Sequence, residues 1–174
     1  SIFDSEVRAH LPPRSTMSLI LQIEKILGEI KPSPKETLAK QLHDIALQIK
    51  RRSMVIVISD FFSDVKDIMK GLDHLRFDGH NVIALHTLDP YELEFPFKGT
   101  WRFDALEDED QVITQPERIR EDYLDSLNSY LKDFSDACIR SQIDYTTVNT
   151  SQSLDLVLRE FLQKRTSSAN GPRG

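Results

Sequence analysis

Polar residues that could bind a ligand stand at the ends of three segments that the sequence predicts as strands. They are Asp60, Asp89 and Asn149. In open parallel sheets ligands bind outside the carboxyl ends of the strands, so these side chains mark the edge where a site would form. Asp60 could be an oxygen ligand for magnesium. Aspartate at a strand end also commonly starts a turn, as does an Asp-Pro pair such as Asp89-Pro90, so a structural interpretation stays open.

Other residue types that carry catalysis do not form a recognisable set. The five histidines have none of the usual zinc spacings, and the single cysteine, Cys138, cannot complete such a site. The six glycines form neither a Gly-x-Ser-x-Gly motif nor a phosphate loop. The acidic run 107–110 could imitate paired carboxylates, but consecutive charges in a turn are usually solvated. We therefore expect no catalytic activity, no cofactor in this chain, and a buried, inert Cys138.

Hydrophobic periodicity predicts the elements that must position these residues. Apolar residues at helical spacing predict helices at 17–30, 38–49, 65–75, 116–141 and 154–162. The second helix begins with a capping pattern, Ser33-Pro34-Lys35-Glu36. Apolar runs predict strands at 54–58, 81–88 and 143–148, the first covered on both faces, and a hairpin at 101–113. This alternation predicts an α/β fold: a Rossmann-like parallel sheet flanked by helices, plus a small β-hairpin.

Length and composition limit the class of protein. The 174 residues, 39% hydrophobic and 29% charged, suit one domain at 1–166, followed by a segment rich in Ser, Gly and Pro, 167–174, that is predicted to be a disordered tail. The net charge of −6 argues against a nucleic-acid partner, because such binding needs clustered Lys and Arg. No apolar run approaches the ~20 residues that span a bilayer, so we expect a cytoplasmic protein without a membrane segment. The chain begins without Met, from which we expect a fragment of a longer protein.

Several short stretches, in this order and spacing, point to one family. They are Leu-Pro-Pro-Arg-Ser at 11–15, Val-Ile-Ser-Asp-Phe at 57–61, Gly-His-Asn-Val at 79–82, Leu-Asp-Pro at 88–90 and Ile-Asp-Tyr at 143–145, leading to Thr150. From Phe3 to Arg165 the chain resembles the C-terminal part of the bacterial "domain of unknown function 58" proteins, which carry a von Willebrand factor A-like fold. The resemblance implies a Rossmann-like sheet, no established catalytic activity, and association with AAA+ ATPases of the MoxR type, whose genes commonly neighbour those of the family.

The same resemblance implies a partial metal site. Von Willebrand A folds often hold magnesium in a metal-ion-dependent adhesion site, built from an Asp-x-Ser-x-Ser loop, a Thr in a second loop and an Asp in a third. Asp60 matches the third element and Thr37 is the best match to the second, although Lys35-Glu36 stand where the family usually has Gly-Gly. The first element would lie upstream, so magnesium is expected only in the full-length protein. Asn149-x-Ser151-x-Ser153 has a similar spacing, which we interpret as a turn and helix cap.

The leading hypothesis is a non-catalytic protein-binding module, a partner or adaptor of a MoxR-type AAA+ ATPase, that binds through the carboxyl edge of its sheet. Two alternatives stay open: a small magnesium-dependent phosphohydrolase in which Asp60 and Asp89 share the metal, and a structural piece of a larger assembly. The implied strand order places missing N-terminal strands beside the run 54–58. We therefore expect that edge either to drive self-association or to be covered by residues 1–14.

Overall fold

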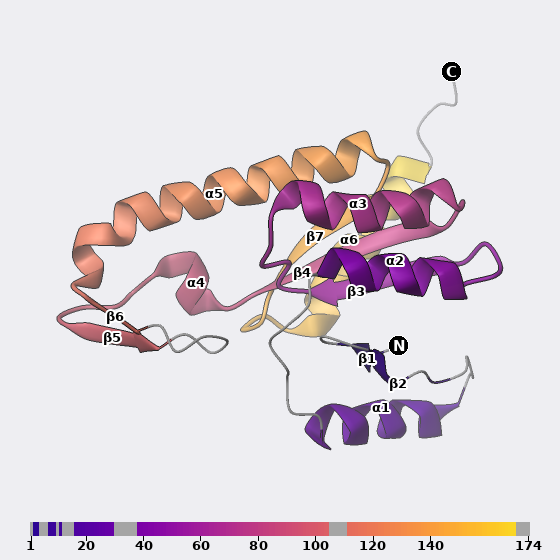
Figure 1. Ribbon diagram of the computed structural model, residues 1–174, viewed down its shortest axis with the longest axis horizontal. Helices are drawn as coiled ribbons and strands as arrows, with labels where there is room; N and C mark the ends of the chain where they lie inside the picture. The colour runs from indigo at the N-terminus through magenta and orange to yellow at the C-terminus, as the bar shows by residue number, and fades with distance from the viewer. Residues whose placement is uncertain are drawn as a thin grey trace.

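The computed structural model describes residues 2–3, 7–9, 11, 16–29, 38–104 and 111–169. The N-terminal part holds a short hairpin and one helix: β1 (Ile2–Phe3), β2 (Val7–Ala9) and α1 (Met17–Glu29). The α/β part then follows in the order α2 (Leu38–Gln48), β3 (Met54–Ser59), α3 (Val65–Phe77), β4 (Asn81–Leu88), α4 (Pro90–Glu94), β5 (Trp101–Asp104), β6 (Gln111–Thr114), α5 (Pro116–Arg140), β7 (Asp144–Asn149) and α6 (Leu154–Ala169). Figure 1 shows the arrangement.

The central sheet has three parallel strands in the order β3-β4-β7. The register sets Ile56 beside Ile83 and Ala84 beside Tyr145. β5 and β6 form a separate antiparallel pair, and Figure 1 shows them at the far end of α5 from β7. The predicted α/β fold, with a parallel sheet flanked by helices and a small β-hairpin, is confirmed.

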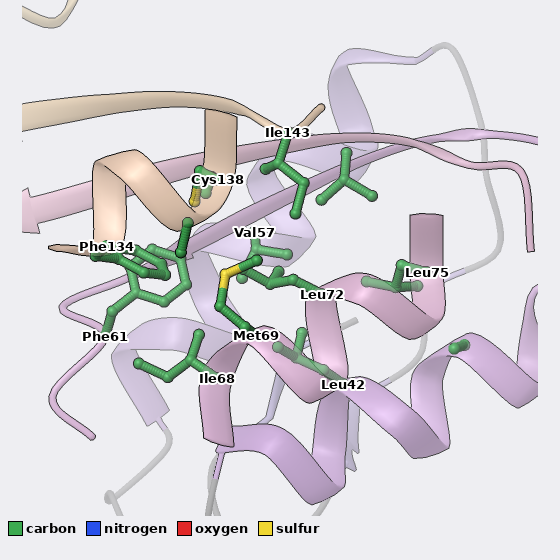
Figure 2. Close-up of a cluster of buried hydrophobic side chains, with 14 residues drawn as sticks. Leu42, Val57, Phe61, Ile68, Met69, Leu72, Leu75, Phe134, Cys138 and Ile143 are labelled. Carbon is green, nitrogen blue, oxygen red and sulfur yellow. The ribbon is translucent and has the colours of Figure 1, made fainter. Parts of the chain in front are cut away.

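One face of the sheet is covered by α2, α3 and α5 and carries the main core. Buried side chains of these helices pack against Val57, Val82 and Ala84 of the strands. Figure 2 shows Phe61 beside Phe134 at one end of this core and Leu75 at the other. Cys138 is fully buried in it, and burial raises the pKa of its thiol to about 12, in agreement with the predicted inert cysteine.

The opposite face is covered only in part. Figure 1 shows α6 behind the strands, and Arg165 of this helix forms a 3.5 Å ion pair with Asp144 of β7. On this face β4 is buried, whereas the outward residues of β3 remain open: Met54, Ile56 and Ile58 are 57%, 51% and 64% exposed. The prediction that residues 54–58 are covered on both faces was therefore wrong, because only the alternate side chains of this run, such as Val57 at 5% exposed, face the core.

Two local features differ from the sequence prediction, and three predicted features lie outside the described residues. The Asp89-Pro90 pair begins a short helix, α4, instead of a simple turn. α6 continues to Ala169, so residues 167–169 of the predicted tail are helical; Ser and Ala tolerate a helix, and the strong breakers Gly171 and Pro172 come later. The capping pattern at 33–36, Thr37 and the acidic run 107–110 lie outside the described residues.

Candidate binding site at the carboxyl end of the sheet

The three strand-end polar residues all make local hydrogen bonds. Asp60 Oδ1 accepts bonds from Ser59 Oγ and from the backbone N–H of Phe62, both at 3.3 Å. Asp89 caps α4, because its Oδ1 accepts from the Tyr91 N–H at 2.8 Å while Glu92 accepts from the Asp89 N–H.

Asn149 Oδ1 accepts from the N–H and hydroxyl of Ser151, at 2.9 and 2.8 Å. The interpretation of this segment as a turn is therefore confirmed. All three side chains serve turn and cap chemistry of the kind expected where strands leave a core.

The loop after β3 has a fixed and unusual backbone. Phe61 adopts a left-handed conformation, with φ of 47°, although its side chain is fully buried. Its N–H donates to Ser59 Oγ at 3.0 Å, and the Tyr130 hydroxyl from α5 donates to the Phe61 carbonyl. Left-handed geometry is costly for a bulky residue and persists only where the surroundings enforce it. The result is that the next residue, Phe62, points outward and is 92% exposed.

A buried aromatic cluster supports this loop from below. His86 of β4 is 1% exposed, and its Nδ1 shares a 2.9 Å hydrogen bond with the Tyr145 hydroxyl. The ring of Phe61 lies 4.9 Å from that of Phe134 and 5.3 Å from that of His86, measured between centroids. Burial lowers the pKa of His86, opposed by a hydrogen bond with the Asp60 backbone. His86 therefore acts as a neutral, buried support that ties the Asp60 loop to two strands.

The two tyrosines of this cluster are also held in their neutral form. Burial is the main cause that raises the pKa of Tyr130 to about 12, and burial raises the pKa of Tyr145 as well. A neutral phenol can donate its proton, as Tyr130 does to the backbone of the loop. The two tyrosine hydroxyls beneath Phe62 are therefore uncharged hydrogen-bond donors.

An open hollow lies beside this loop, between the start of α3 and the part of α5 from Asp125 to its end at Arg140. The residues that line it are mostly of polar type: Ser63, Asp64, Val65, Lys66, Asp125, Ser126, Ser129, Tyr130, Asp133, Asp136 and Arg140. Four aspartates stand against one lysine and one arginine, so the surface is acidic. Asp64 is also engaged locally, since its Oδ1 caps α3 by accepting from the Lys66 N–H at 2.8 Å.

The donor set around Asp60 gives little support to a metal site. Among the described residues, no three His, Cys, Asp or Glu side chains are grouped so that they could hold a metal ion. Magnesium requires near-octahedral oxygen ligation, and the neighbouring hydroxyl oxygen of Ser59 is already hydrogen-bonded to Asp60. Thr37, the second implied ligand, lies outside the described residues. We therefore assign no chemical step to a metal at this site.

Sequence reasoning located Asp60 but missed the residues that shape its surroundings. Phe62 lies two residues after Asp60 in the sequence. A phenylalanine in a loop that follows a strand is a signal that could have identified it. Tyr130 and His86 were not predictable as loop supports, because Tyr130 is 69 residues from its acceptor Phe61 and on a helix stripe that indicated only core packing.

A comparison with known protein families shows the family to which this chain belongs. Residues 1–130 match the family described as "Protein of unknown function DUF58". The chain belongs to this family. The match contains the Asp60 loop and most of α5, whereas β7 and α6 lie beyond it. No curated protein and no solved structure gives a significant match. Within the described residues no helix is long and apolar enough to cross a membrane.

Proposed function

We propose that this DUF58 chain is a non-catalytic protein-binding module that docks its partner at the carboxyl end of the sheet, with Phe62 as the anchor. One observation carries the proposal: a phenylalanine that is 92% exposed stands on a loop whose backbone is fixed from beneath. Aromatic side chains are the common hot spots of protein interfaces, where a few residues provide most of the binding energy.

Rigidity makes this anchor effective. Ordering a loop or side chain on binding costs about 0.5–1.5 kcal/mol per immobilised side chain, which lowers affinity. Here Ser59, Phe61 and Tyr130 already hold the loop through hydrogen bonds and packing. Phe62 therefore needs to lose only its own rotamer freedom when it enters a partner pocket.

Charge indicates the chemistry of the partner. Asp60 and Asp64 flank Phe62, and the neighbouring hollow adds Asp125, Asp133 and Asp136 from α5. Electrostatic complementarity favours a partner surface with an apolar pocket rimmed by Lys or Arg, because opposite charges steer encounter and like charges repel.

For the identity of the partner we propose an AAA+ ATPase of the MoxR type, met in the cytoplasm. The support for this choice is the family itself, whose genes commonly neighbour those of MoxR-type ATPases. The acidic surface around Phe62 is compatible with a partner face rich in basic residues. In this proposal the chain contributes recognition, and the nucleotide chemistry belongs to the ATPase.

Binding of the chain to the MoxR-type ATPase encoded nearest to its gene tests the proposal. We expect Phe62→Ala to raise Kd at least about tenfold, as for a hot-spot residue. Phe77→Ala is the matched control, since Phe77 is 90% exposed but lies at the other end of α3, about 20 Å along a helix of 13 residues. Asp60→Ala should also weaken binding, while it changes the free energy of unfolding by less than about 1 kcal/mol. Equal effects of Phe62→Ala and Phe77→Ala, or no binding by the unmodified chain, would overturn the proposal.

A further inference from the structure

The hollow between α3 and α5 is a second surface beside Phe62 that a partner could contact. The start of α3 forms one wall, and one face of α5 forms the other. Figure 1 shows the two helices side by side, with α2 on the other side of α3, and α3 packs against both. The hollow has a volume of about 830 Å³ and is open to solvent. It is therefore large enough to receive a segment of another protein.

The wall on α5 contains a continuous polar stripe. Its members are all exposed and follow one another at intervals of three or four residues, which places them on one helix face: Asp125, Ser129, Asp133, Asp136 and Arg140. At 1.5 Å per residue the stripe is about 22 Å long. A segment that lies in the hollow would therefore meet several of these side chains in succession.

The carboxylates of this stripe have no partner within the described part of the chain. None of Asp125, Asp133 and Asp136 forms an ion pair or a side-chain hydrogen bond there. Other exposed aspartates are paired, as Asp67 of α3 is with Lys70 at 2.6 Å. Three unpaired negative charges along an open hollow favour an occupant that brings positive charges.

We propose that the partner places a basic α-helix in this hollow, along α5, with Lys or Arg side chains facing Asp125, Asp133 and Asp136. This inference rests on the proposed function, because the helix belongs to the partner that Phe62 anchors. A helix has the same period and rise as α5, so its residues i, i+8 and i+11 recur at the spacing of the three carboxylates. Residues on one face of a strand recur about every 6.6 Å, which does not fit the step of about 4.5 Å from Asp133 to Asp136.

Phe62 and the stripe have different tasks in this complex. Phe62 is exposed on the loop that leads into α3, and the next residue, Ser63, already lines the hollow. The phenylalanine supplies apolar contact area, which provides most of the affinity at a hot spot. Exposed charge pairs add little affinity each, but they speed the encounter, orient the helix and repel acidic segments. The stripe therefore determines which segment of the partner binds beside Phe62.

Binding of the full chain to the MoxR-type ATPase encoded nearest to its gene, measured at low and high salt, tests this inference. The double variant Asp125→Asn/Asp133→Asn should raise Kd about fivefold at low salt and reduce the salt dependence of Kd, because two charge pairs are lost. The matched control Asp44→Asn/Glu160→Gln removes two exposed carboxylates of α2 and α6, outside the hollow, and should leave both quantities nearly unchanged. Hydrogen exchange of the complex should protect a helical segment of the ATPase with Lys or Arg at i, i+8 and i+11.

Several results would overturn the inference. One is an equal effect of the two double variants; if Phe62→Ala still weakens binding, the proposed function then stands without the helix. Another is protection of an extended or acidic segment of the ATPase. Absence of binding by the unmodified chain would overturn the inference together with the proposed function. All four substituted side chains are exposed, so each double variant should keep the circular dichroism spectrum of the unmodified chain.

Discussion

Replacement of Tyr130 by Phe removes a side-chain hydroxyl with which α5 holds the Phe61 loop. The hydroxyl donates to the Phe61 carbonyl and lies 3.2 Å from the Ser63 carbonyl, but it has a single proton and contributes about one hydrogen bond. A hydrogen bond of this kind stabilises a protein by about 0.5–1.5 kcal/mol. The Phe61 carbonyl also keeps the Ser63 N–H as a donor at 2.8 Å, so no buried acceptor is left unpaired. We therefore expect Tyr130→Phe to lower the free energy of unfolding by about 1 kcal/mol.

Urea denaturation followed by circular dichroism measures this change, with the slope of the transition expected to stay the same. Tyr123→Phe is the control, because Tyr123 lies on the same helix and is half-buried but makes no hydroxyl hydrogen bond within the described residues. Its effect should stay within about 0.5 kcal/mol. Two results would refute the reasoning: equal changes for both variants, or a loss of about 3 kcal/mol or more for Tyr130→Phe, which would mean that the loop collapses without the hydroxyl. Tyr130→Phe should also weaken partner binding through Phe62, since the loop that presents it loses a support.

Three further predictions concern titration and metal binding. Because burial raises the pKa of Cys138 from 9.0 to about 12, the folded chain holds a proton that the unfolded chain releases, so stability should fall as the pH rises from about 9 toward 12. Cys138→Ala should flatten this loss in thermal melts, and an unchanged alkaline slope would contradict the assignment. His86 should titrate below its ordinary value of 6.5 in NMR spectra, and since the unfolded chain then binds the proton more readily, stability should fall as the pH drops through that value. Titration calorimetry should show no tight magnesium binding by this chain, and micromolar binding that Asp60→Ala abolishes would disprove this.

Local sequence patterns predicted the elements because they depend on neighbouring residues. The β-branched run at 54–58 forms β3, and the acidic-turn hairpin forms β5 and β6. The long amphipathic stripe that starts near Pro116 forms α5, which ends at Arg140. Asp60 was correctly placed at a strand end for the same reason. The structural role of Asp89 also has a local cause, because an Asp-Pro pair suits both a turn and the capping box that α4 uses.

What the sequence by itself determined is therefore the set of elements, their order and the α/β class, since side-chain periodicity and turn chemistry specify them along the chain. Only the tertiary structure decided which faces are covered and which residues meet. The run 54–58 looks equally apolar on both sides, yet Val57 is buried whereas Met54, Ile56 and Ile58 are more than half exposed. Phe61 and Phe62 are identical neighbours, yet one is buried and the other exposed, because a hydroxyl 69 residues away on Tyr130 and the ring of His86 fix the loop between them. Such contacts join segments that are distant along the chain, and no local pattern encodes them.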